Sequence, residues 1–209
     1  MITVAALMAT TPKRDAFRPR AVECFYQQVF PAGWQVDLLI DHDETGTLGV
    51  KLNRMTASTD AEYLITWDDD DWHSPTRLAR QIQPLIDGYK ISGTSTIYYH
   101  DIRTDQGWLY TGHTHIWMGG MAWQRSCWEK RKFMDRTVGV DTRWQQMLRG
   151  MYPPDKFSFD LKDPALFVAT AHPQNSCPKN FNTISWKPAV LPECMCQQSS
   201  RRSGYCPVP

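Results

Sequence analysis

In the stretch Tyr63-Leu64-Ile65-Thr66-Trp67-Asp68-Asp69-Asp70-Asp71-Trp72, four consecutive aspartates follow a short hydrophobic run. The run 63–67 combines β-branched, aromatic and aliphatic residues, which predicts a buried strand. Ser74 and Pro75 are typical of a helix start, with a hydroxyl N-cap and proline at the first helical position. Leucine and isoleucine then recur at helical spacing until Gly88 ends the helix. Ligands bind at such strand-to-helix junctions in open α/β sheets, so we expect a site at the aspartates.

The chemistry expected of this acidic stretch is that of a metal ion and a phosphate. Four adjacent carboxylates repel one another, and folding does not require them. Asp68 and Asp70 point to the same side of an extended backbone, with about 6.6 Å between their Cα atoms. Such oxygens suit Mg²⁺ or Mn²⁺, which keep positions open for phosphate oxygens. A solvated acidic turn is the alternative, but the hydrophobic strand, the flanking tryptophans and the capped helix favour metal–phosphate chemistry.

Length and composition predict one domain with a small appendage. The chain has 209 residues, enough to bury a core, and a net charge of +1, which indicates no particular partner. It lacks an apolar run of about 18 residues, so no transmembrane helix is expected. The N-terminal residues read as a core strand rather than a signal peptide. The six cysteines show no regular framework, which favours a reducing cytoplasm, the host's if the chain is phage-encoded.

The acidic stretch, with Pro75 a few residues further on, resembles the D-x-D segment of family 2 glycosyltransferases with the GT-A fold. The resemblance covers most of residues 1–172. It implies an α/β fold of GT-A type, a Rossmann-like mixed sheet flanked by helices. It also implies a single domain 1–176, divided into a nucleotide-binding half 1–88 and an acceptor half 89–176.

The resemblance implies metal and donor contacts within the acidic stretch. Asp68 and Asp70 are the expected metal ligands, and Asp68 and Asp69 are expected to contact the nucleotide-sugar donor. His172 follows the last apolar strand, predicted at residues 166–171, and resembles a position where GT-A enzymes often supply another metal or diphosphate contact. Imidazole is a suitable ligand for Mn²⁺ beside carboxylates.

The loops after the first two predicted strands are also expected to bind the donor. In Thr10-Thr11-Pro12-Lys13-Arg14, hydroxyls, exposed N–H groups and Arg14 suit an anion, although an ordinary helix start is the alternative. The resemblance implies that this loop touches the nucleotide. Asp41-His42-Asp43-Glu44 resembles the family's second motif, which implies that Asp41, or else Asp43, contacts the base or ribose.

Two further segments complete the predicted frame. Gly49-Val50-Lys51-Leu52-Asn53-Arg54 resembles the family's G-x-K-R-N run, with leucine where arginine is common. The implied role of Lys51 and Asn53 is nucleotide and diphosphate binding, and a solvated helical face is the alternative. Residues 90–102 and 108–111 are rich in β-forming residues on either side of a turn, which predicts a hairpin.

The acceptor half carries the expected catalytic base. Gly139-Val140-Asp141-Thr142-Arg143-Trp144 resembles the family's G-E-D-x-x-F pattern, with valine in place of the usual glutamate. The resemblance implies that Asp141 is the base, and the N-terminus of the helix that it starts favours the charged carboxylate. A plain capping role is the alternative. Upstream, His113, His115 and Trp117 alternate without nearby carboxylates, which favours ordinary surface or substrate-contact histidines over a metal site.

The tail, residues 177–209, shows no helical or strand periodicity and is rich in Pro, Ser and Cys. Its four thiols could form a structural Zn²⁺ site, although their spacing is a weak match to known zinc motifs. These cysteines are Cys177, Cys194, Cys196 and Cys206. Thiols without a metal, or an occasional disulfide, are the favoured alternative.

Together these features predict a metal-dependent, inverting glycosyltransferase that moves a sugar from a nucleotide sugar, a UDP-sugar by family resemblance, to an acceptor hydroxyl. A saccharide is one acceptor. Because residues 125–136 are locally basic, a hydroxymethylated base in DNA, as some phages require, is another. A solvated helix surface is the alternative for that segment. Two rival classes remain: a nucleotidyltransferase, whose opening loop should contain glycine, and a non-catalytic nucleotide- or sugar-binding module.

Overall fold

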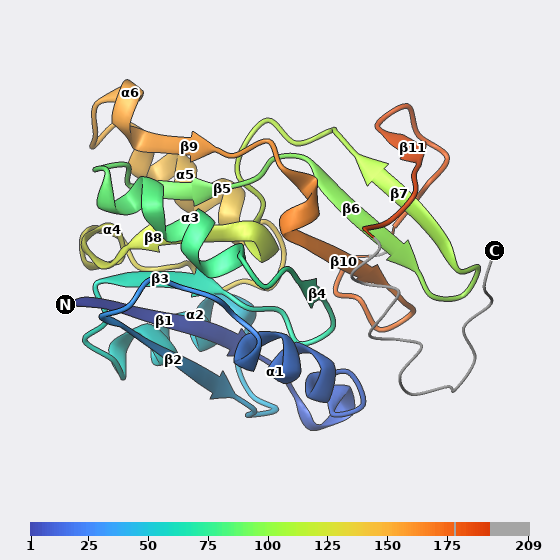
Figure 1. Cartoon of the computed structure of the whole chain (residues 1–209), viewed down its shortest axis with the longest axis horizontal. Coiled ribbons are helices and arrows are strands. Elements are labelled where there is room, and N and C mark those ends of the chain that lie inside the picture. Colours follow the sequence, from blue (N-terminus) through green and yellow to red (C-terminus); the bar gives the residue numbers. More distant parts are fainter. Residues whose placement is uncertain (178, 193–209) are drawn as a thin grey trace.

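Two sheets form the fold, and the computed structural model describes residues 1–177 and 179–192. The strands of the first sheet are β1 Ile2–Ala9, β2 Trp34–Asp41, β3 Tyr63–Thr66, β5 Ile91–Gly93, β8 Met121–Gln124 and β9 Ser158–Asp160. Those of the second are β4 Trp72–His73, β6 Ile97–Asp101, β7 Gln106–Tyr110, β10 Phe167–Ala171 and β11 Trp186–Pro188. The strand orders are β2-β1-β3-β8-β5-β9 and β11-β7-β6-β10-β4, and the two sheets lie next to each other in Figure 1.

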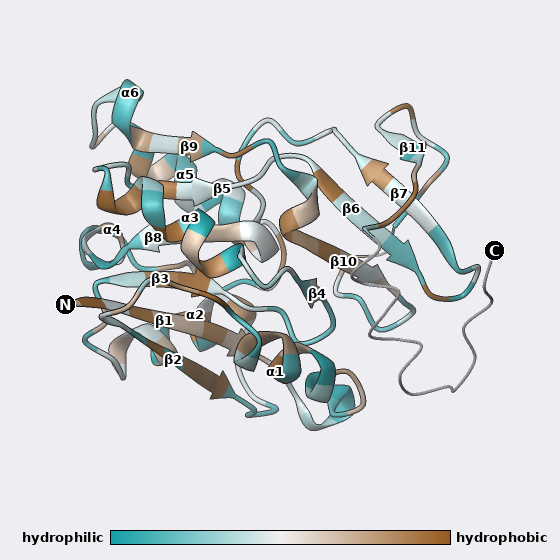
Figure 2. Cartoon of the chain, viewed as in Figure 1, coloured by the Kyte–Doolittle hydropathy of each residue, from teal (hydrophilic) through white to brown (hydrophobic). Residues whose placement is uncertain are grey.

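Helices cover both faces of the first sheet. They are α1 Arg18–Tyr26, α2 Leu48–Ala57, α3 Arg77–Ile86, α4 Arg125–Lys130, α5 Val140–Arg149 and the short α6 Pro154–Phe157. Along β1, Ala5 and Leu7 pack with residues of α2, α4 and α5, whereas Ala6 and Met8 pack with residues of α1 and α3. A strand that is buried on both faces needs apolar side chains at successive positions. This explains why β1 and β3 are mainly brown in Figure 2.

The parallel strands bring three loops to one edge of the first sheet. β1 pairs in parallel with β2 and with β3, and Ala9 lies opposite Asp41 while Leu7 lies opposite Thr66. The carboxyl ends of these three strands therefore meet. The segments found there are the loop after β1, the acidic cluster 41–44 and the four aspartates.

The four aspartates connect the two sheets. β3 ends at Thr66, and β4, which begins at Trp72, belongs to the second sheet, where it pairs with β10. The two indoles, Trp67 and Trp72, are buried in one core cluster. Because both indoles are held in this core, the intervening residues 68–71, the acidic loop, are confined to the junction between the sheets.

The hairpin predicted after residue 90 is confirmed, with a change at its start. β6 and β7 pair antiparallel. The residues before β6 form β5, a strand of the other sheet. The chain leaves that sheet at Gly93, where an added Cβ would lie 2.1 Å from the Gly120 carbonyl oxygen, so the close approach of the two backbones requires glycine.

Two other local predictions differ from the structure. α3 begins at Arg77 with Thr76 as its N-cap, and Ser74 and Pro75 form a turn before it, in which the Ser74 carbonyl accepts from the Arg77 amide. The tail contributes a strand, β11, which pairs with β7 through Trp186. The sequence does not predict β11 because a strand of three residues is too short to show an alternating pattern. No helix within residues 1–177 and 179–192 has the length and apolar character needed to cross a membrane.

Candidate active site

A cavity of about 770 Å³ lies at the junction of the two sheets. The acidic loop forms part of its lining, together with residues of the loop after β1, of the N-terminal turn of α5 and of the second sheet. Several of the predicted site residues line this one space: Thr10, Thr11, Arg14, Lys51, Asp68, Asp69, Asp70 and Asp141. The tertiary structure thus brings residues from both halves of the predicted domain into one site.

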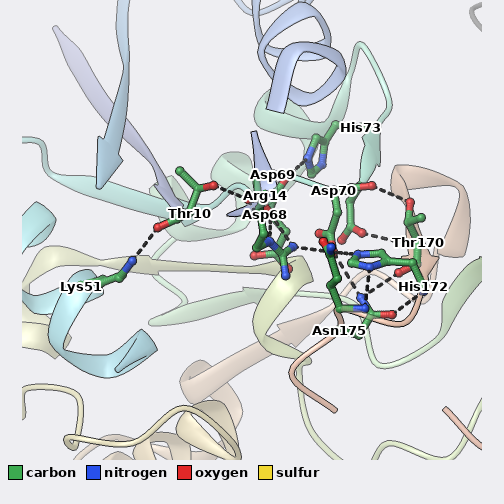
Figure 3. A network of polar contacts seen from close by, with 12 residues as sticks. Thr10, Arg14, Lys51, Asp68, Asp69, Asp70, His73, Thr170, His172 and Asn175 are labelled. Atoms are coloured by element: carbon green, nitrogen blue, oxygen red, sulfur yellow. Dashed lines mark hydrogen bonds and ion pairs between the residues drawn. The ribbon is translucent and has the colours of Figure 1, made fainter. Parts of the chain in front are cut away.

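The loop after β1 binds the acidic loop directly. Thr10 and Arg14 both donate hydrogen bonds to the Asp69 carboxylate, and the Arg14 guanidinium also lies 2.6 Å from Asp70 Oδ2 (Figure 3). Burial alone would lower the pKa of Arg14, but these contacts outweigh that effect and raise it. Arg14 is therefore a fixed positive charge that lines the cavity beside the aspartates.

The segment after β10 holds the other side of the acidic loop. His172 Nε2 lies 2.8 Å from Asp70 Oδ2, and Asn175 Nδ2 donates to the same oxygen at 3.2 Å (Figure 3). Thr170 fixes the loop backbone, since its hydroxyl donates to the Asp70 carbonyl, and its amide donates to Asp71 Oδ1 at 2.8 Å. His172 does not itself line the cavity, but it contacts an expected metal ligand.

The acidic loop holds more negative charge than its partners neutralise. Burial, followed by the charges of Asp70 and Asp69, raises the pKa of Asp68 to about 7. Burial also raises the pKa of Asp71 well above its usual value, and Asp71 Oδ2 is buried without a hydrogen-bond partner among the described residues. The pKa of Asp70 is lowered: burial alone would raise it, but the hydrogen bond with His172 and the Arg14 charge outweigh that effect.

A divalent cation fits this set of donors. Carboxylate oxygens with raised pKa values gain stability from a nearby cation, and an imidazole beside them extends the set to Mn²⁺. Within residues 1–177 and 179–192, however, no three His, Cys, Asp or Glu side chains already converge on one point. The expected ligands Asp68, Asp70 and His172 must therefore rearrange to share an ion, because Asp70 is engaged by Arg14 and His172.

A buried arginine, Arg77, packs beside the acidic loop on the side away from the cavity lining. Arg77, which is 0% exposed, donates to the carbonyls of Thr66 and Gly119 and to the ring of His73. Burial lowers its pKa to about 10, and its charge acts on Asp68. Arg77 thereby anchors the end of β3 and partly offsets the negative charge in front of it.

On the donor side, Lys51 is less available to a ligand than its sequence pattern suggests. Its amino group donates to the carbonyl of Thr10 (Figure 3) and to that of Asp43, which ties together the loops after β1 and β2. Burial lowers its pKa. Lys51 thus shapes the cavity wall, whereas Pro12 is exposed and lies outside the lining.

Besides Pro12, three predicted donor contacts are not brought to the cavity. The Asp41 carboxylate forms two hydrogen bonds with Arg54, each 2.8 Å long, and Asp43 pairs with the same arginine at 3.3 Å. Asn53 uses its side chain within the core, where it accepts from Trp128 Nε1 at 2.8 Å and donates to the Phe133 carbonyl. In the structure these three side chains therefore have partners within the protein and lie outside the cavity lining.

Asp141 lies in the first turn of α5 and lines the cavity. Its Oδ2 accepts from the Met118 amide at 3.0 Å, and its Oδ1 accepts from the Thr142 amide at 2.8 Å. The pKa of Asp141 is lowered: burial alone would raise it, but the neighbouring His115 imidazole and the two amides outweigh that effect. The carboxylate is therefore charged and held in one orientation at the cavity wall.

Sequence reasoning misses the partner of Asp141. His115 Nε2 lies 3.6 Å from Asp141 Oδ2 and 3.0 Å from the Thr142 hydroxyl, and it lines the cavity with His113 and Trp117. The sequence shows the alternation of these residues but places no carboxylate near them. The carboxylate comes from α5, which begins at Val140, far from His115 along the chain.

The predicted zinc site falls mostly outside the described residues. Cys194, Cys196 and Cys206 all lie beyond residue 192, and Cys177 lines the cavity. The structure therefore does not test this prediction.

The chain belongs to glycosyl transferase family 2: a profile of the family described as "Glycosyl transferase family 2" matches residues 32–147, more than half of the chain. The matched segment contains the acidic loop and Asp141. No curated protein was found to match the sequence.

Solved glycosyltransferase structures share the fold. TarS of S. aureus, residues 1–349 in complex with UDP, has a TM-score of 0.56 and 11% identity, covering 82% of this chain and 61% of that one. The mannosyltransferase PcManGT of Pyrobaculum calidifontis, in complex with GDP-Man and Mn²⁺, has a TM-score of 0.59 and 13% identity, covering 83% and 58%. The chain thus spans about three-fifths of the length of these two solved chains. The GT-A fold predicted from the sequence is confirmed.

Proposed function

We propose that this chain transfers a sugar from a nucleoside diphosphate sugar, a UDP-sugar first, to an acceptor hydroxyl, with inversion at the anomeric carbon. The observation that carries the proposal is that Asp141 and the acidic loop line one cavity. A donor diphosphate against the aspartates and a hydroxyl against Asp141 can then meet in the same space.

The donor is held at the junction of the sheets. Arg14 and the hydroxyls of Thr10 and Thr11 line the cavity and suit the diphosphate oxygens. TarS has been solved with UDP-GlcNAc, and PcManGT with GDP-Man and Mn²⁺, which supports a nucleotide sugar as the ligand of this fold. A bound Mn²⁺ or Mg²⁺ would supply charge stabilisation of the departing diphosphate, with Asp68, Asp70 and His172 as its proposed ligands.

Asp141 acts as the base. The acceptor oxygen forms a bond to the anomeric carbon, the bond from that carbon to the diphosphate oxygen breaks, and the hydroxyl proton passes to Asp141. A single displacement of this kind inverts the configuration. The amides of Met118 and Thr142 hold the carboxylate in place, and its lowered pKa keeps it charged and ready to accept the proton.

The basic segment does not support a DNA acceptor. None of residues 125–136 lines the cavity. Lys130 lies 4.2 Å from the ring centroid of Tyr152, and Lys132 lies 3.5 Å from that of Trp128, so both cations already have aromatic partners. Hydroxymethylated DNA therefore belongs in the acceptor screen as a comparison, and membership of family 2 does not favour the nucleotidyltransferase alternative.

The test is Asp141→Asn, assayed with a panel of UDP- and GDP-sugars and Mn²⁺. We expect donor binding, followed as thermal stabilisation, to remain, and transfer or slow donor hydrolysis to fall by about 100-fold or more, because a general base contributes at least that much. The matched control is Asp155→Asn, which removes an exposed carboxylate in the first turn of α6. Loss of donor binding together with activity would contradict the assignment of the base, and so would full activity.

A further inference from the structure

The second sheet contributes an aromatic surface to the cavity. It is formed by β6, β7, β11 and the segment between β7 and β8, and we call it the aromatic wall. Its members are Tyr99, Tyr110, His113, Trp117 and Trp186. These residues are scattered along the sequence, and neither the proposed donor contacts nor the base uses them.

The rings of the aromatic wall hold one another in place. The ring centroid of Trp186 lies 4.5 Å from that of Tyr110 and 4.9 Å from that of Tyr99. Trp117 stacks on Phe167 at 5.4 Å with an interplanar angle of 10°. Apart from Tyr99, the wall residues are only partly buried, and all of them line the cavity. Part of their ring surface is therefore accessible to a ligand.

The aromatic wall adjoins the proposed reaction centre. The His113 ring centroid lies 5.4 Å from that of His115, whose Nε2 is 3.6 Å from Asp141. At Gly119, an added Cβ would lie 2.4 Å from the Trp117 ring and 2.6 Å from Asp68 Oδ2, so ring and carboxylate flank the same glycine. An acceptor molecule whose hydroxyl lies at Asp141 would therefore have its remaining atoms against the aromatic wall.

The wall offers little charge. Among the described residues of this part of the lining, Lys179 is the one Lys or Arg, and its amino group lies 5.4 Å from the Tyr99 ring centroid. Burial, followed by the charge of His115, lowers the pKa of His113 to about 4, so this imidazole is neutral near pH 7. An uncharged ligand with apolar ring faces suits such a surface better than a polyanion.

We propose that the aromatic wall is the acceptor subsite and that it binds the pyranose rings of a neutral saccharide by stacking. This inference rests on the proposed function for the transfer step. Four of the wall residues lie within the segment matched by the family, whereas Trp186 lies outside it, so the family match does not account for the contribution of Trp186. Nucleobases also stack on aromatic rings, but a nucleic acid needs a track of cations for its backbone, which the described residues of the wall do not provide.

The test uses cellotetraose, maltotetraose, chitotetraose and a hydroxymethylated DNA oligonucleotide as acceptors. The variants are Trp186→Ala, Trp186→Phe and, as a matched aromatic deletion outside the cavity lining, Tyr26→Ala, at a residue that is 79% exposed. For one or more saccharides we expect Trp186→Ala to lower binding and transfer by about tenfold, Trp186→Phe to restore most of it, and Tyr26→Ala to change nothing. Thermal stabilisation by UDP with Mn²⁺ reports that each variant is folded.

Three results would overturn the proposal: transfer to a saccharide that Trp186→Ala leaves unchanged, transfer to the oligonucleotide alone, or donor hydrolysis without binding of any of the three saccharides. Saccharide binding is measured without donor by isothermal titration calorimetry. Binding that depends on Trp186 in a protein that does not turn over any donor would support the subsite and contradict the proposed function, so the two failures are distinguishable.

Discussion

Arg14 lies where it can compete with a metal ion for the carboxylates of the acidic loop. Its guanidinium contacts both Asp69 and Asp70, and Asp70 is an expected metal ligand. In the structure a protein cation therefore competes for the carboxylate oxygens. A donor diphosphate would give Arg14 a new anionic partner and free Asp70.

For Arg14→Gln we expect Mn²⁺ binding without nucleotide to become tighter, because the competing cation is gone, and UDP binding to become weaker by about tenfold, because a charged hydrogen bond to phosphate is lost. Both are measured by calorimetry. Lys13→Gln removes the same charge from an exposed neighbour and serves as the control. Weaker Mn²⁺ binding by the free variant would show that Arg14 does not compete with the ion.

The titration of Asp68 makes metal binding depend on pH. With its pKa raised to about 7 by burial and by its acidic neighbours, Asp68 is protonated below that pH in the folded protein, and an ion must displace the proton. We therefore expect Mn²⁺ affinity to rise with pH up to about 7 and to level off above it. Calorimetry in two buffers of different ionisation enthalpy would measure the proton released. A Mn²⁺ affinity that does not change between pH 5 and pH 8 would contradict Asp68 as a metal ligand with a pKa of about 7.

Titration of Asp68 also affects the stability of the fold without metal, which falls as the pH rises, whereas Mn²⁺ affinity increases. An aspartate has a pKa near 3.9 in the unfolded chain, lower than that of Asp68 in the fold. Between these two values the folded state binds more protons than the unfolded state, so this group makes folding less favourable as pH rises from about 4 to about 7. A bound cation offsets that loss.

Among the helices, α5 sets the position of Asp141 through its first turn. Gly139, the N-cap, has φ 67° and ψ 28°, a left-handed conformation that costs other residues about 1 kcal/mol. No atom lies within 4 Å of a Cβ added there, so backbone strain is the main effect of a substitution.

We expect Gly139→Ala to lower the free energy of unfolding by about 1 kcal/mol and to reduce transfer, because relief of the strain shifts the first turn that carries Asp141. Gly150→Ala is the matched control at the other end of the helix, where φ is −79° and the added Cβ also has open space. Denaturant unfolding and the transfer assay provide the measurements. Equal stabilities of the two variants would refute the role given to Gly139.

Local patterns predict the elements around the acidic loop well and their ends less well. β3 and the hydrophobic face of α3 follow from residues that are neighbours in sequence, and both are present. α3 begins at Arg77, later than predicted, because Ser74 and Pro75 form a turn before the helix. A capping signal therefore locates a helix start only to within a few residues.

In the molecule as a whole, the site lies where the acidic loop crosses from one sheet to the other. β3 ends in the first sheet, β4 begins in the second, and the acidic loop spans the distance between them. Parallel pairing brings the loop after β1 to this junction, and the first turn of α5 adds Asp141 to the same cavity. The aromatic wall comes from the second sheet, so the proposed donor and acceptor surfaces lie on different sheets.

The α/β class, the buried strand before the aspartates and the helix that carries Asp141 could all be inferred from the printed residues, because each depends on the spacing of apolar and capping residues along a short segment. The folded chain was needed to show that Arg54 holds Asp41, that His115 lies beside Asp141 and that Trp186 joins the aromatic wall. These outcomes depend on distances between residues far apart in sequence, where burial and charge select partners that no local pattern specifies.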